Sequence, residues 1–235
     1  MKLHLIIFFL AGSFCYSQDF SEKFAGDICE CFSKQQNEKT PVFDPSVMDT
    51  CFNIPNEKYR TDLELLFLLE NIDTSTVVNP YQEGQELGKL MGKKVFDNIQ
   101  SQLINSCDSY FDYFVKSQKT MLINLGKGVT KHKVDSITNL IEKSHWPTNL
   151  IWERGSFQLG LGNTQAAKSD FETCLKRSPI HVPALFFLAW AHDIEGNYAL
   201  AIPLYERMIE QSTHSMVFMA KIYLAVDLRK VKEGG

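Results

Sequence analysis

The sequence predicts an all-α protein, and three observations support this fold class. Apolar residues recur every three to four positions through most of the chain, which is the period of one face of an α-helix. Alternation of apolar and polar residues, the sign of a half-buried strand, is not visible at useful length. The last third of the chain also repeats a pattern, because Gly162-Asn163 returns 34 residues later as Gly196-Asn197. A fixed period of this length is typical of stacked helical units.

Composition places the chain among globular proteins. Its 235 residues are 44% hydrophobic and 22% charged, which is enough apolar content to bury a core. The net charge of −4 is mildly acidic and argues against a nucleic-acid binder.

The first seventeen residues have the layout of a secretory signal peptide. Lys2 is followed by an apolar run over residues 5–10, and small residues occur at Cys15 and Ser17. We therefore expect cleavage after Ser17 and a secreted or periplasmic protein. A lipoprotein would require a small residue before Cys15, where the bulky Phe14 stands. No later run reaches ~18 apolar residues, so we expect no membrane span.

Residues 18–130 are predicted to form a helical N-terminal domain. Helices are expected over residues 18–36, 46–51, 61–72, 81–107 and 108–125. The segment 37–45 is polar and contains Pro41 and Pro45, so it is predicted to be a loop. Pro55 is expected to break the chain between two of the helices.

The cysteines of this domain predict two disulfide bonds. Cys29, Cys31, Cys51 and Cys107 can pair in three ways, and a secreted protein matures in an oxidising compartment. On a helix, Cys29 and Cys31 point about 200° apart, so each is expected to bond to a different neighbour. We favour Cys31–Cys51 and Cys29–Cys107, with the reverse assignment left open. Cys174 is expected to be a free, buried packing residue.

Residues 131–235 are predicted to form a short repeat region. Two copies cover residues 148–181 and 182–215, and at the offset of 34 Ala167 meets Ala201 and Phe171 meets Tyr205. Because two repeats rarely bury enough surface alone, flanking helices are expected. Residues 131–145 provide a capping helix or decayed repeat, and residues 216–231 provide a capping helix at the other end.

The repeated residues resemble the tetratricopeptide repeat, a helix-turn-helix unit. The family has a small residue where its two helices meet, as at Gly155 and Ala189, and a turn where Gly162 and Gly196 stand. Arg154 departs from the family pattern, which favours leucine there, and the second copy follows the pattern more closely. The chain as a whole also resembles, loosely, secreted repeat proteins of Bacteroidetes.

The resemblance implies a site for protein partners. Tetratricopeptide repeats bind extended peptides or partner helices on the concave face of their first helices. The repeat register places the following residues on that face: Trp152, Glu153, Ser156, Phe186, Phe187, Trp190, Lys221 and Leu224. The groove either binds a partner or is filled by the protein's own N-terminal domain or tail.

Motifs that carry catalysis are not found in the sequence. It contains no zinc-protease helix, nucleophile elbow or phosphate-binding loop, and its histidines do not pair at metal-ligand spacing. We predict a non-enzymatic interaction protein without cofactor, metal or catalytic residues. Two alternatives remain: an enzyme, hydrolase-like, with an unmarked site in the N-terminal domain, and a structural component of the cell envelope.

Overall fold

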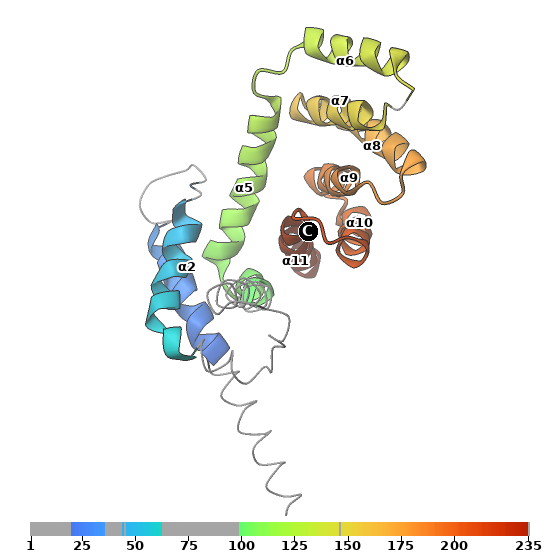
Figure 1. Ribbon diagram of the computed structural model, residues 1–235. Coiled ribbons are helices and arrows are strands. Elements are labelled where there is room, and N and C mark those ends of the chain that lie inside the picture. Colours follow the sequence, from blue (N-terminus) through green and yellow to red (C-terminus); the bar gives the residue numbers. More distant parts are fainter. Residues whose placement is uncertain (1–19, 36–43, 45, 63–98, 146, 235) are drawn as a thin grey trace, which may run out of the picture. The chain divides into compact units, whose positions relative to one another are not determined.

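The computed structural model describes residues 20–35, 44, 46–62, 99–145 and 147–234 (Figure 1). Every regular element in these segments is helical, which confirms the all-α fold class. The predicted signal peptide lies outside the described residues, as does most of the helices predicted over residues 61–72 and 81–107. The chain divides into two compact units, Met1–Tyr110 and Phe111–Gly235, and each is described by itself.

The first unit packs helix 20–35 against α2 (Ser46–Lys58) and helix 99–106. Apolar side chains at helical spacing form its core, and Ile28 and Phe32 are completely buried. The Phe32 ring meets the Tyr110 ring edge-on, with centroids 4.8 Å apart. The remaining buried side chains of this core include Phe24, Cys51, Leu103 and Ile104.

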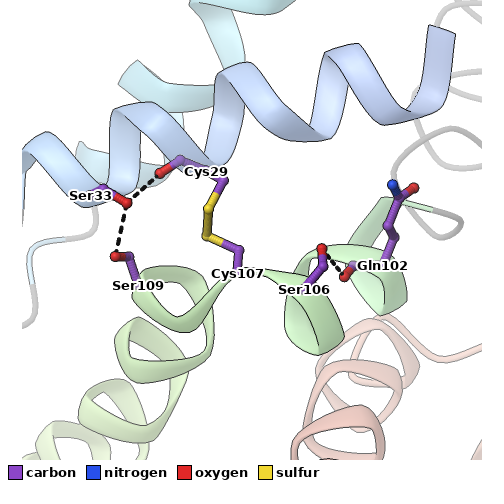
Figure 2. Close-up of a disulfide and its surroundings, with 6 residues drawn as sticks. All are labelled: Cys29, Ser33, Gln102, Ser106, Cys107 and Ser109. Carbon is purple, nitrogen blue, oxygen red and sulfur yellow. Dashed lines mark hydrogen bonds between the residues drawn. A yellow bond between two sulfur atoms is a disulfide. The ribbon is translucent and has the colours of Figure 1, made fainter. Parts of the chain in front are cut away.

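Two disulfide bonds cross-link the helices of the first unit. Cys29 pairs with Cys107 at a Cα–Cα distance of 5.7 Å, and Cys31 pairs with Cys51 at 5.4 Å. Figure 2 shows the Cys29–Cys107 bond, beside which the Ser33 hydroxyl lies 3.0 Å from the Ser109 hydroxyl. These are the pairs favoured above, and helix 20–35 is thereby joined to both of its neighbours.

Helix α2 corrects one expectation from the sequence. Pro55 was expected to break the chain, but α2 continues through it to Lys58. Proline removes one backbone donor and crowds the preceding turn. The helical hydrogen bonding nevertheless resumes after the buried Pro55, whose carbonyl accepts a hydrogen bond from the Tyr59 N–H at 2.9 Å.

The second unit begins within helix α5 (Asp108–Gly126) and continues through a stack of helices. These are α6 (Lys131–Lys143), α7 (Thr148–Gly160), α8 (Thr164–Arg177), α9 (Val182–Ile194), α10 (Tyr198–Gln211) and α11 (Val217–Lys232). The helix predicted to precede the first repeat is α6, which packs on α7 and begins after Thr130. The Thr130 hydroxyl accepts a hydrogen bond from the Lys133 N–H and so caps α6.

Glycine and alanine residues occupy the predicted positions at the turns and helix contacts of the two repeats. Gly162 and Gly196 follow α7 and α9 with φ of 80° and 75°, the left-handed conformation that lets a helix end and the chain turn back. Ala167 and Ala201 are completely buried where the second helix of each repeat packs. A Cβ added at Gly155 would lie 2.7 Å from the Phe171 ring, so a larger residue there would require that ring to shift.

The two compact units divide within the first turn of α5, between Tyr110 and Phe111. Most of α5 therefore belongs with the repeat helices, and this determines what surface they offer. The domain boundary near residue 130 stays a prediction from the sequence.

Candidate functional site

The first helices of the repeats, α7 and α9, together with α11, form a surface that we call the inner face. All eight predicted groove residues lie on these three helices. Trp152, Glu153, Phe187, Lys221 and Leu224 are half-buried, whereas Ser156, Phe186 and Trp190 are buried.

The aromatic residues of α7 and α9 form one continuous cluster. The Phe187 ring lies 5.8 Å from the Trp152 ring, 5.7 Å from the Trp190 ring and 5.6 Å from the Phe186 ring. The four rings meet close to edge-on or tilted, as aromatic pairs prefer. The predicted cluster therefore exists, but its members differ in the surface they expose.

Two of these rings belong to the core instead of an open groove. Phe186 and Trp190 are 2% and 1% exposed, so neither can contact a partner as the chain stands. The Phe186 ring lies 6.0 Å from Tyr205 of α10 and 5.8 Å from Tyr223 of α11. Adjacent helical residues point about 100° apart, so Phe186 points between helices while Phe187 stays near the surface.

Helix α5 covers part of the inner face. The Gln118 amide donates a hydrogen bond to Asp193 near the end of α9, and the Tyr223 hydroxyl of α11 lies 3.1 Å from the Met121 sulfur. The Arg229 guanidinium of α11 stacks 4.3 Å from the Phe111 ring centre. In Figure 1, α5 passes beside α7, α9 and α11. A segment of the protein's own chain thus fills the part of the face that these contacts define.

The contacts of α5 with α7 and α9 lie near the ends of these two helices, whereas two partly exposed rings lie nearer their starts. Gly160 and Asp193 stand at or near the ends of α7 and α9, and they are where α5 makes contact. Trp152 and Phe187 belong to the first halves of the same helices and remain half-buried. These two rings are the aromatic members of the predicted groove that stay partly exposed.

Two glycines bring the backbones of α5 and α7 close together. A Cβ on Gly126 would overlap the Gly160 carbonyl oxygen, and a Cβ on Gly160 would lie 2.5 Å from the Gly126 nitrogen. Both contacts involve backbone atoms, which cannot rotate away. Backbone contact of this kind explains why α5 ends against α7 at glycine.

Gly160→Ala is expected to lower the free energy of unfolding by about 1–3 kcal/mol, because the two backbones must separate to admit the methyl group. Urea unfolding measures the loss. Gly26→Ala is the matched control, since no atom lies within 4 Å of its Cβ position on helix 20–35. The control is expected to gain about 0.5–1 kcal/mol from helix propensity. An equal gain in stability in Gly160→Ala and Gly26→Ala would contradict the close contact between the backbones of α5 and α7.

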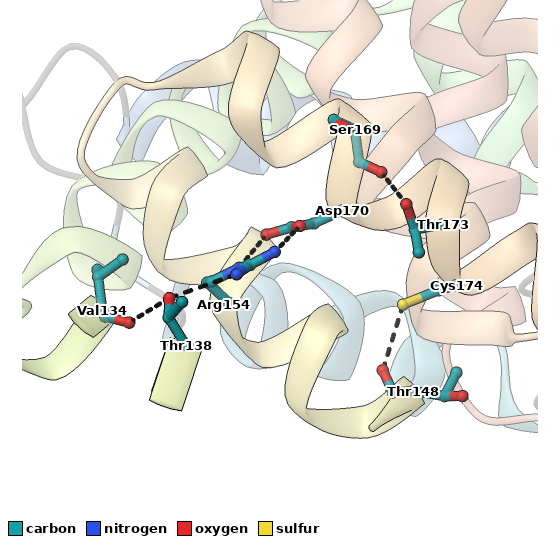
Figure 3. Close-up of polar contacts among 8 residues, drawn as sticks. All are labelled: Val134, Thr138, Thr148, Arg154, Ser169, Asp170, Thr173 and Cys174. Carbon is teal, nitrogen blue, oxygen red and sulfur yellow. Dashed lines mark hydrogen bonds and ion pairs between the residues drawn. The ribbon is translucent and has the colours of Figure 1, made fainter. Parts of the chain in front are cut away.

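Polar contacts hold the first repeat together behind the inner face (Figure 3). The Arg154 guanidinium donates to both carboxylate oxygens of Asp170, at 2.9 and 2.6 Å, and to the Thr138 hydroxyl at 3.3 Å. The Cys174 thiol donates to the Thr148 carbonyl oxygen at 3.2 Å. Cys174 is a free, buried cysteine, as expected, and burial raises its pKa to about 11, so the thiol is protonated at neutral pH.

A metal or membrane site is not evident in the described part of the chain. Within those residues, no three histidine, cysteine or acidic side chains gather as metal ligands would. Among the same residues, no helix combines the length and the apolar character needed to cross a bilayer.

Sequence reasoning missed the residues through which α5 occupies the face. Gln118 and Asp193 are polar side chains that the structure buries, at 7% and 5% exposure. Gln118 stands in the polar run 116–120 and Asp193 follows His192, so the sequence does not mark either residue as buried.

Comparison with protein families supports the repeat. Residues 149–181 match the tetratricopeptide repeat model, which makes this a protein containing such a repeat. The match falls on the first copy, in which Arg154 departs from the family pattern. Neither the curated proteins nor the solved structures compared with the chain gave a match. The comparisons therefore add no support for the resemblance to Bacteroidetes proteins.

Proposed function

We propose that this repeat-containing chain is a non-enzymatic protein–protein interaction module that works outside the cytoplasm. The repeat match carries the proposal, since such repeats serve to bind protein partners on their inner face. The extracytoplasmic setting is supported by the signal-like first seventeen residues and by two disulfide bonds, which persist in oxidising compartments.

The partner is proposed to bind at Trp152 and Phe187. These rings are the half-buried members of the aromatic cluster, and their centroids lie 5.8 Å apart across α7 and α9. Tryptophan and other aromatic residues dominate binding energy at protein interfaces because they bury a large rigid surface. Glu153, half-buried and next to Trp152 in the sequence, adds a negative charge to the same helix. An extended peptide or a helix with an apolar anchor and a basic flank would suit this surface.

A photo-crosslinking amino acid placed at Phe187 in the native cell tests the proposal. The crosslinked protein is identified by mass spectrometry, and its affinity is then measured with purified wild-type and Trp152→Ala proteins. A loss of about 30-fold or more is expected, as for a hot-spot residue. Circular dichroism establishes that the variant is folded.

Leu200 provides the matched control, because it is 55% exposed on α10, away from the inner face. A crosslinker at Leu200 is expected to capture no protein in common with Phe187, and Leu200→Ala is expected to keep wild-type affinity. Unchanged affinity in folded Trp152→Ala would show that the partner binds elsewhere.

A further inference from the structure

Two aspartates are buried side by side where α9 meets α11. Asp193 is 5% exposed and Asp227 is completely buried. Asp193 is well satisfied, because Lys230 donates to one of its oxygens at 2.6 Å and the Gln118 amide donates to the other. Asp227 lacks such partners, since neither of its carboxylate oxygens accepts a hydrogen bond from a donor among the described residues. Lys230 lies 3.6 Å from Asp227, within ion-pair distance only.

The charges of this cluster do not balance if both aspartates are ionised. One lysine then faces two carboxylates, and a buried charge without its own partner is strongly unfavourable. A single proton held between Asp193 and Asp227 removes the excess charge and supplies Asp227 with the hydrogen bond that it lacks. Burial and repulsion by Asp193 raise the pKa of Asp227 to about 8, against the opposing effect of Lys230.

The groups around the cluster leave the proton with the aspartates. Tyr205 of α10 is buried and its hydroxyl has no partner in the described structure, and burial raises its pKa well above the usual range. The pKa of Tyr223 on α11 is raised to about 12, so both phenols stay neutral. The Lys230 ammonium also faces the Tyr198 ring at 5.0 Å, and α5 contributes only the uncharged Gln118.

We propose that Asp193 and Asp227 share one proton and, with Lys230 and Gln118, form a proton-operated latch that holds α5 and α11 on α9. The latch joins these three helices because Asp193 lies on α9, Asp227 and Lys230 on α11, and Gln118 on α5. Loss of the proton leaves a second carboxylate in the core. We expect α11 to move so that water can reach that charge, which disturbs the contacts of α5 with α11 and with Asp193. The inference holds whether or not Trp152 and Phe187 bind a partner.

The direction of the pH effect follows from linkage. The folded protein holds the Asp227 proton up to about pH 8, whereas the unfolded chain releases it near the ordinary value of 3.8. Between these values the folded state binds one more proton, so stability from this group falls as pH rises. The contribution is present at low pH, declines through the window and is gone above about pH 8.

Urea unfolding of the full chain from pH 5 to pH 9 tests the latch, with wild type compared with Asp227→Asn. Asparagine keeps the shape and can donate to Asp193 without titrating. The unfolding constant of wild type, divided by that of Asp227→Asn, is expected to increase by up to tenfold for each unit that the pH is raised. This ratio is expected to level off above about pH 8. Burial lowers the pKa of His181 and of His192. Because both proteins contain these histidines, their contribution to the pH dependence cancels in the ratio. Parallel pH curves would overturn the shared proton.

Two further measurements separate a latch from a merely buried acid. Hydrogen exchange, corrected for the intrinsic rate, is expected to lose protection in residues 111–126 above pH 8 in wild type but not in Asp227→Asn. Equal protection of that segment at pH 7 and pH 9 in wild type would overturn the latch. Lys230→Gln removes the opposing cation, so the levelling point is expected to move to higher pH. A levelling point that stays at the same pH, or moves to lower pH, would contradict the role of Lys230 as the cation that opposes protonation.

Discussion

Replacing Cys29 and Cys107 by alanine is expected to lower the free energy of unfolding of the first unit by about 4.5 kcal/mol. The bond joins residues that lie 78 positions apart, so it restricts the unfolded chain strongly. In the folded unit it ties helix 20–35 to the residue that immediately precedes α5. The loss is measured by urea unfolding of the double variant under oxidising conditions.

The second disulfide supplies the matched control for loop length. Cys31 and Cys51 are separated by only 20 positions, so the same entropy model expects a loss of about 3.3 kcal/mol when both become alanine. Peptide mapping without reductant is expected to recover both pairs from wild type. A greater loss in the short-loop variant, or free thiols at Cys29 and Cys107, would refute the expectation.

Arg154→Ala is expected to destabilise the second unit by about 3 kcal/mol, at the lower end for breaking a buried ion pair. The side chain of Asp170 is only 10% exposed, and Arg154 satisfies both of its oxygens. Removing the guanidinium leaves that carboxylate nearly buried without a partner. The contact to Thr138 on α6 is lost as well. Thermal and urea unfolding measure the change.

Two companion variants show whether the effect comes from burial. Lys131 and Asp135 also form an ion pair, but their side chains are 90% and 55% exposed, so Lys131→Ala is expected to change stability by less than about 0.5 kcal/mol. Replacing both Arg154 and Asp170 by leucine is expected to recover most of the loss, because no unpaired charge remains. Equal losses in the Arg154 and Lys131 variants would rule out the buried pair.

The repeat architecture could be predicted because its signals are local. Gly162 and Gly196 are required by a left-handed turn, and Ala167 and Ala201 by close helix packing, so each leaves a trace at a fixed offset. The continuation of α2 through Pro55 was missed for the opposite reason. Whether a proline ends a helix depends on the burial of that turn, which is a tertiary property.

Covering of the groove by the protein's own chain is one of the two alternatives that the sequence leaves open, but the sequence does not identify α5 as the covering segment. Apolar spacing shows which side of α9 is buried, but it does not show which segment lies against that side. The repeat register therefore places Trp190 in the groove, although Trp190 is 1% exposed. Asp227 was missed as well, since a carboxylate in a helix usually indicates a solvent-exposed face.

The position of α5 also decides where a recombinant fragment of the repeat region has to begin. A fragment starting at Lys131 matches the repeats as the sequence delimits them, but it lacks Gln118 and Met121. Asp193 would lose a hydrogen bond and the inner face would become an exposed apolar surface, which invites aggregation. A fragment starting at Asp108 keeps α5 complete and also excludes Cys107, so it carries Cys174 as its single thiol. The natural cloning boundary is therefore the start of α5, one residue after the disulfide.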